Sequence, residues 1–168
     1  MFEKFFSNHP YALLALIITV FAAMMIAMFA NTGEVTPATC QQVSEVLDDL
    51  NYKTEDSTEY YKQQNSNLKA SIYADNGNVK FNFFEFTDDS EAQAMFNGAH
   101  SQIVKEGHEG IRRWSEGYNN YVMYATLSHD NVYYTVIRVG NTGIYAYCDD
   151  EYTQELGEIF EKIGYPKS

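Results

Sequence analysis

Residues 11–30 constrain the organisation of this chain more than any other segment. The stretch reads YALLALIITVFAAMMIAMFA and holds no charged residue. A helix of this length spans about 30 Å, which is the hydrocarbon thickness of a lipid bilayer. The sequence therefore predicts a membrane-spanning helix over 11–30, with a short N-terminal segment before it and a polar region after it.

A cleaved signal peptide is the alternative interpretation, because it also combines a short basic segment with an apolar run. Signal peptides usually have an apolar core of about 7 to 15 residues that ends at a small-residue cleavage site. Here the run is longer, and cleavage after Ala30 would place Met28 where a small side chain is required. These features favour an uncleaved membrane anchor.

The charges that flank the apolar run indicate its orientation. Lys4 precedes the run, and no lysine or arginine follows it until Lys53. Since positive residues concentrate on the cytoplasmic side, residues 1–10 are expected in the cytoplasm and the C-terminal domain outside the cell membrane.

Small residues recur at every fourth position of the predicted membrane helix. Rows of this kind let two helices approach closely, although small residues are also common in such helices by chance. Helix packing into a homo-oligomer is therefore one interpretation of Ala15, Thr19, Ala23 and Ala27.

The region after the helix is long enough for a single hydrophobic core. We expect a linker over 31–36 and one domain over 37–168. The formal net charge is −12, and the charges of residues 1–30 cancel, so the whole excess lies in residues 31–168. Such a surface repels nucleic acid and excludes it as a partner, whereas a cationic partner or divalent ions are compatible with it.

Hydrophobic periodicity predicts three helices and five strands in the domain. Helices are expected from Thr36 and Pro37 onward, after Asp88 or Asp89, and after Asp149 or Asp150. Their apolar stripes include Val43, Val46, Leu47 and Leu50, then Ala92, Phe96, Ala99 and Ile103, and finally Tyr152, Leu156, Ile159, Phe160 and Ile163. Strands are expected at 68–74, 79–86, 121–127, 132–139 and 143–148, and 53–67 is expected to be a loop or an edge strand.

The short connections between these strands favour antiparallel neighbours. In the second strand, apolar side chains change face near Phe83, which indicates either a bulge or a strand buried on both faces. The order α-β-β-α-β-β-β-α predicts an α+β fold, a two-layer sandwich of an antiparallel sheet with helices on one face.

Tyrosines gather on one side of the predicted last strand. Tyr145 and Tyr147 alternate with Ile144, Ala146 and Cys148, and neighbouring strands add Tyr124 and either Tyr133 or Tyr134 to the same face. An uncovered tyrosine face suits a protein or glycan partner. The alternative is that cross-strand aromatic pairs only stabilise a solvated sheet.

Two cysteines, Cys40 and Cys148, follow the membrane helix. Outside the cytoplasm an even number of cysteines favours a disulfide, which would join the first helix to the last strand. Two free thiols are the alternative.

No sequence motif predicts a catalytic centre, a cofactor or a metal site. The pairs Asp88–Asp89 and Asp149–Asp150 could serve acid–base chemistry or calcium binding, but helix capping explains both more simply. In the segment 106–119, Arg112 and Arg113 stand beside Trp114. These three residues are candidates for gripping a carboxylate or anchoring an interface, and the alternative is that Trp114 covers the core.

The segments RVGNTGIYAYCDDEYTQELGEIFEKIGY (Arg138 to Tyr165) and FFEFTDDSEAQAMF (Phe83 to Phe96) resemble small uncharacterised ectodomains of Gram-positive bacteria, of membrane-anchored or lipoprotein type. The resemblance implies an extracytoplasmic α+β domain and transfers no activity. Together these features predict a non-enzymatic, single-pass membrane protein that presents a binding or accessory domain in the cell envelope. The alternatives are an envelope hydrolase or metal-dependent enzyme that uses the aspartate pairs, and an inhibitor or immunity-type protein that binds through its sheet.

Overall fold

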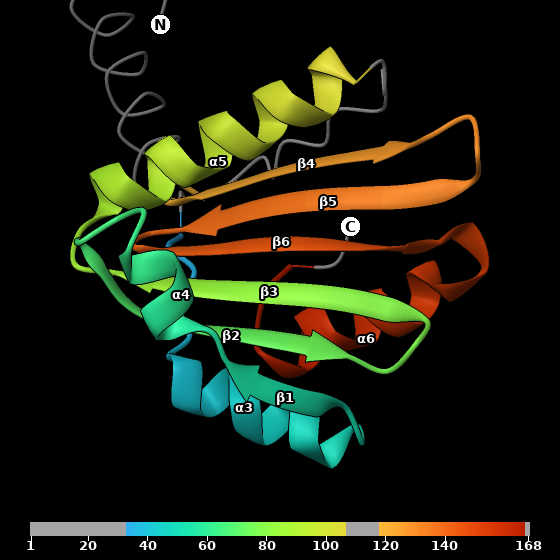
Figure 1. Cartoon of the computed structure of the whole chain (residues 1–168), viewed down its shortest axis with the longest axis horizontal. Helices are drawn as coiled ribbons and strands as arrows, with labels where there is room; N and C mark the ends of the chain where they lie inside the picture. Colours follow the sequence, from blue (N-terminus) through green and yellow to red (C-terminus); the bar gives the residue numbers. More distant parts are fainter. Residues whose placement is uncertain (1–32, 107–117, 167–168) are drawn as a thin grey trace, which may run out of the picture. The chain divides into compact units, whose positions relative to one another are not determined.

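A six-stranded antiparallel sheet is the centre of the domain (Figure 1). Its strand order is β1-β2-β3-β6-β5-β4, so the C-terminal meander of three strands joins the N-terminal strands through the β3–β6 pair. The strands are β1 (Lys53–Asp56), β2 (Leu68–Asp75), β3 (Val79–Phe86), β4 (Tyr121–Leu127), β5 (Val132–Val139) and β6 (Thr142–Asp149).

The computed structural model describes residues 33–106 and 118–166. The predicted membrane helix, with its row of small residues, lies outside this part of the chain. Within the two described ranges, no helix combines the length and the apolar character needed to cross a membrane. The folded unit begins at Glu34, and Val35 is buried in its core.

In the described part of the chain, four α-helices and one short 3-10 helix accompany the sheet. They are α3 (Cys40–Asp49), α4 (Thr58–Lys62), α5 (Asp89–Lys105), the 3-10 helix η1 (Asp150–Tyr152) and α6 (Thr153–Lys162). The α+β class and all five predicted strands are confirmed. The expected edge strand within 53–67 is β1, whereas α4 was not predicted.

The helix starts differ from the predictions at two places. Helix α3 begins after Thr39, because Thr39 and Gln42 form a capping box in which each side chain binds the backbone of the other. The predicted start at Thr36 is therefore wrong. Asp88 caps α5 as expected, whereas Asp149 makes no capping hydrogen bond and precedes η1.

One face of the sheet, here called the core face, packs against α3 and α6. Val79, Phe81 and Phe83 of β3 alternate toward this face and are fully buried. Leu47 of α3 and Phe160 of α6 cover them, and the Phe81 and Phe160 rings lie 6.4 Å apart. This face holds the main hydrophobic core.

The opposite face, here called the tyrosine face, is covered in part by α4 and α5. Phe96 and Ile103 of α5 pack on Val136 of β5, and Ala92 packs with Phe84 and Phe86 of β3. Helix α4 lies on β2 at the other side of this face (Figure 1). Helices therefore cover both faces, and the predicted two-layer arrangement with helices on one face is wrong.

Strand β3 explains why helices cover both faces. Its pairing with β6 is unbroken, and its side chains are buried alternately on the two faces, so each face needs a covering layer. Of the two explanations for the change of face near Phe83, burial on both sides is confirmed. The register irregularity lies in β2 instead, between Leu68 and Ala70.

The predicted disulfide between Cys40 and Cys148 is wrong, and both thiols are free. The Cys40 amide donates to the carboxylate of Glu85 (3.1 Å), whereas Cys148 pairs with Val79. Glu85 and Val79 stand six residues apart on β3, which is roughly 20 Å at the rise of a strand. A disulfide requires Cα atoms within about 7 Å, so the bond cannot form in this fold.

We expect both thiols to be present without reductant and to react slowly in the folded chain. Burial, reinforced by nearby carboxylates, raises the pKa of Cys40 to about 12 and that of Cys148 to about 11. Since only the thiolate is nucleophilic, alkylation at pH 8 should be at least about a hundredfold slower than for an ordinary exposed cysteine. Mass spectrometry after iodoacetamide treatment, with and without denaturant, measures how much of each cysteine is alkylated. Fewer than two alkylated cysteines in the unreduced, unfolded chain would contradict it.

Candidate functional site

The tyrosine face contains an open groove of about 490 Å³ between α4 and the middle of the sheet. We call it the tyrosine groove. Five elements contribute to it: β2, β3 and β6 form its floor, and β1 and α4 form its wall. It is lined by Glu55, Asp56, Ser57, Tyr60, Tyr61, Tyr73, Asn82, Tyr145 and Tyr147.

Strand register assembles the floor of the groove from residues that are distant in sequence. Tyr73 of β2 is paired with Asn82 of β3, and Asn82 is paired with Tyr145 of β6. Glu55 of β1 continues the same row beside Tyr73. Because neighbouring strands lie about 4.8 Å apart, this row presents a carboxylate, a ring, an amide and a second ring in succession.

A second row runs parallel to the first. It pairs Lys80 of β3 with Tyr147 of β6, and Tyr147 with Tyr134 of β5. The Tyr134 and Tyr147 rings stack at 5.7 Å, and the Lys80 ammonium lies 5.4 Å from the centroid of the Tyr147 ring. The chain thus already places one cation over a tyrosine face at this site.

The wall of the groove is held by ring contacts and one hydrogen bond. Tyr61 packs edge-on against Tyr60 at 4.9 Å and against Phe84 at 5.0 Å. Its hydroxyl donates to the Asn82 side-chain oxygen at 3.3 Å. Tyr60 remains 63% exposed, so it stands at the outer rim.

Asn82 has an unused hydrogen-bond donor at the floor of the groove. The residue is only 8% exposed, and its Oδ1 accepts from Tyr61. Within the described ranges 33–106 and 118–166, its Nδ2 has no hydrogen-bond partner. Its Nδ2 is not among the fully buried unpaired atoms of these ranges, so this donor is open to water or to a ligand in the groove.

The electrostatics of the groove are acidic. Two of its nine lining residues carry carboxylates, and none of the nine is lysine, arginine or histidine. Hydrogen bonds from Thr58 lower the pKa of Asp56, which keeps this group negative at neutral pH. Burial raises the pKa of Tyr73 and of Tyr145 to about 12, so both hydroxyls stay neutral. The groove therefore combines aromatic faces with two carboxylates, of which Glu55 is already paired with Lys53 at 3.0 Å.

The lining set suits binding better than bond cleavage. It contains no cysteine or histidine, and its one serine, Ser57, exchanges a hydrogen bond of 2.9 Å with Ser71 rather than with a base. Asp88–Asp89 and Asp149–Asp150 follow the ends of β3 and β6, which are antiparallel, so the two pairs lie at opposite ends of the sheet. They cannot form one site together.

The structure separates the tyrosines that were predicted to share one face. Tyr145 and Tyr147 line the groove, and Tyr134 stacks beside them. Tyr124 lies on the same face but is buried beneath α5, with its ring 4.4 Å from His100. Tyr133 points to the core face, where its strand position is paired with Cys148. Arg112, Arg113 and Trp114 lie outside the described residues.

Seven of the nine groove residues were not among the candidates that the sequence predicted. Tyr60 and Tyr61 belong to the unpredicted helix α4, and Glu55, Asp56 and Ser57 directly precede it. Tyr73 and Asn82 lie on β2 and β3, whose alignment with β6 was not predicted. The signal that could have found Tyr73 and Asn82 is the β3–β6 pairing, because it aligns them with Tyr145.

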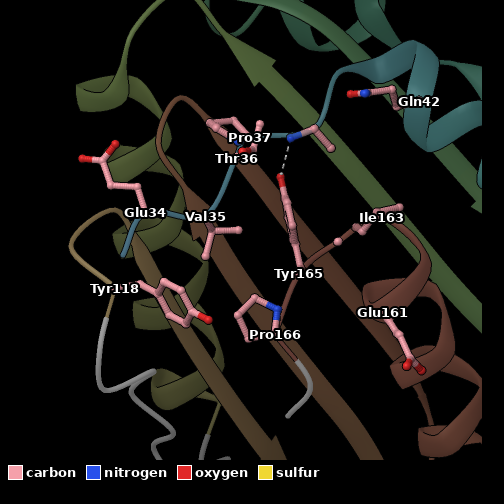
Figure 2. Close-up of a pocket in the computed structure, with 12 residues that line it drawn as sticks. Glu34, Val35, Thr36, Pro37, Gln42, Tyr118, Glu161, Ile163, Tyr165 and Pro166 are labelled. Carbon is pink, nitrogen blue, oxygen red and sulfur yellow. Dashed lines mark hydrogen bonds between the residues drawn. The ribbon is translucent and has the colours of Figure 1, made fainter. Parts of the chain in front are cut away.

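A second hollow, of about 590 Å³, lies where the start of the domain meets its C-terminal segment (Figure 2). Tyr165 reaches into this region, and its hydroxyl accepts from the Ala38 amide at 3.1 Å and bonds the Thr142 hydroxyl at 2.8 Å. Asn120 binds both backbone groups of Val35. These hydrogen bonds hold the start of the domain against Tyr165 and against Asn120, so we assign this hollow a structural role.

Comparisons with known proteins add little to this geometry. No protein-family model matches the sequence, and no curated protein matches it. Among solved structures, the extracellular domain of PknH from Mycobacterium tuberculosis aligns over 71% of this chain and 88% of its own, with 14% identity and a TM-score of 0.33. The two chains share too little backbone geometry for any property to be transferred between them.

Proposed function

We propose that this protein is a single-pass membrane protein whose C-terminal α+β domain is a non-enzymatic binding module outside the cytoplasmic membrane. Binding occurs in the tyrosine groove. The observation that carries the proposal is an open groove of about 490 Å³ on one face of the sheet, lined by five tyrosines and by Asn82. Aromatic surface supplies affinity at such sites, and a few polar groups fix the orientation of the ligand.

The apolar run 11–30 and its flanking charges support the location. Its alanine and threonine row supports helix packing in the membrane, as a subsidiary part of the proposal. The domain itself contributes an acidic, tyrosine-rich surface that suits a protein partner in the envelope. An inhibitor or immunity-type protein would be a special case of this function, because it would also act by occupying a partner through this face.

Cysteine labelling in intact cells tests the location. Tyr60→Cys introduces a thiol at a rim position that is 63% exposed, whereas the two native thiols are shielded by burial and raised pKa values. A membrane-impermeant maleimide should label Tyr60→Cys in intact cells and label the matched N-terminal variant Ser7→Cys only after lysis. The reverse pattern would place the domain in the cytoplasm and overturn this part of the proposal.

A further inference from the structure

We infer that the tyrosine groove receives an uncharged, proline-containing segment of a partner protein, which lies there as a polyproline II helix with proline at every third position. This inference rests on the proposed function and names the class of its ligand. It is carried by three features of the groove: the polar groups that remain open, the charges around it, and the spacing of its rings.

The hydrogen-bond acceptors of the groove are largely engaged within the chain. Asn82 Oδ1 accepts from the Tyr61 hydroxyl at 3.3 Å, and Asp56 Oδ1 accepts from the Thr58 amide at 2.8 Å. Two groups that can donate remain open, the Nδ2 of Asn82 and the hydroxyl of Tyr145. Neither makes a hydrogen bond to a residue of 33–106 or 118–166. The groove therefore suits a ligand that offers acceptors and needs few.

A proline-rich backbone offers this combination. Proline has a carbonyl but no amide N–H, and a polyproline II helix makes no internal hydrogen bonds, so its carbonyls stay available. Sugar hydroxyls also donate and need acceptors in return, and ammonium or guanidinium groups only donate. Grooves lined by aromatic side chains bind proline-rich segments in this conformation. The open donors thus favour a proline-containing segment over a glycan or a basic side chain.

The charges around the groove favour an uncharged ligand. The Glu55 carboxylate is paired with the Lys53 ammonium at 3.0 Å. The Lys80 ammonium lies 5.4 Å from the centroid of the Tyr147 ring, on which it already occupies one face. Both signs of charge are therefore present beside the rings. A ligand with a net charge of either sign is repelled by one of them.

The spacing of the floor rings matches one turn of a polyproline II helix. Tyr73 of β2 and Tyr145 of β6 lie in one row, on either side of Asn82 in β3. Two strand spacings separate the two tyrosines, which is about 9.6 Å. Three residues of polyproline II advance by about 9.3 Å. A segment that crosses the strands along this row places prolines i and i+3 on the two rings and an intervening carbonyl near the Asn82 amide.

The test is calorimetric titration of the full-length chain, in uncharged detergent, with the peptide acetyl-Ala-Pro-Ala-Ala-Pro-Ala-Ala-Pro-Ala-amide. Its matched control is the isomer acetyl-Ala-Ala-Pro-Ala-Pro-Ala-Pro-Ala-Ala-amide, which has the same composition and no two prolines three residues apart. We expect the first peptide to bind at least about fivefold tighter than its isomer, because only the first places prolines on both rings.

Variants assign the binding to the groove. Asn82→Asp keeps the acceptor for Tyr61 and removes the donor, so it should weaken binding of the first peptide at least about fivefold. Tyr145→Leu removes one ring and should weaken it at least about threefold. Tyr118→Leu, at a 40% exposed side chain in the second hollow, is the control and should bind normally. Circular dichroism verifies that each variant is folded.

Several results would overturn the inference. Equal binding of the two isomers, or no binding of the first peptide at millimolar concentration, would exclude a proline segment of this spacing. Tighter binding of chitotriose or of a blocked Ala-Arg-Ala-Arg-Ala peptide, lost in Tyr145→Leu, would reject the proline segment and leave the groove as a binding site. An affinity for the first peptide that is unchanged in both groove variants would reject the inference and count against the proposed site as well.

Discussion

The domain is expected to lose its folded structure cooperatively as the pH rises above about 10, the pKa of an exposed tyrosine. Burial raises the pKa values of Tyr52, Tyr121, Tyr145 and Tyr165, and a hydrogen bond to Glu155 adds to this effect for Tyr52. Each of these side chains keeps its proton in the folded state at a pH where the unfolded chain has released it.

The sign of the effect follows from this difference. Since the folded-state pKa values are raised, the stabilisation is complete below pH 10 and is lost as the pH rises toward those values. Each group lowers the free energy of unfolding by up to about 1.4 kcal/mol per pH unit in that window. Four groups give up to about 6 kcal/mol per pH unit, which is comparable with the whole stability of a small domain.

Far-ultraviolet circular dichroism against pH measures this transition. Tyr145→Phe should make it shallower by about one proton, because the change removes one of these titrating hydroxyls and breaks no hydrogen bond among the described residues. Tyr60→Phe, at a side chain that is 63% exposed, should leave it unchanged. Retention of the full signal at pH 12 would contradict the packing of these tyrosines.

Replacing Phe160 by alanine should cost about 3–5 kcal/mol of the free energy of unfolding. Phe160 is fully buried and connects α6 to the core face, where its ring lies 6.4 Å from that of Phe81. Removing the Phe160 side chain leaves a cavity that the sheet cannot close, because Val79 and Phe83 beside Phe81 are already packed.

Urea unfolding of the full-length chain measures this cost. Leu127→Ala is the matched control, because Leu127 is 44% exposed at the end of β4 and its truncation should change stability by no more than about 0.5 kcal/mol. A loss below about 1 kcal/mol in Phe160→Ala would show that α6 does not pack on β3 as described.

Local patterns predicted the individual strands well. β3, β4 and β5 have the predicted limits, because alternation, the Asn76–Gly77 turn and short connections are local signals. Gly77, in the turn between β2 and β3, and Gly164, after α6, have the positive φ angles that glycine adopts readily. Helix α4 has only five residues, which is too short to show a helical period.

The layers and the groove could not be predicted in the same way, because both depend on which strands are neighbours. The β3–β6 pairing connects two strands that are distant in sequence, and it places Tyr73, Asn82 and Tyr145 in one row. The same pairing separates Cys40 from Cys148 along β3. Alternation alone predicted Tyr145 and Tyr147 as binding candidates. The wall formed by α4 and the position of the Asn82 amide could be found only from the assembled sheet.

Photocrosslinking in the native membrane tests most directly whether the tyrosine groove is the binding site. p-Benzoylphenylalanine replaces Tyr60 at the groove rim, ring for ring, and in a matched variant it replaces Leu127, whose register with Tyr133 places it on the core-face side. Our account predicts a discrete crosslinked product from position 60 that disappears when Tyr147→Leu is added, and no such product from position 127. A product of equal yield from both positions, or one that persists in Tyr147→Leu, would contradict it.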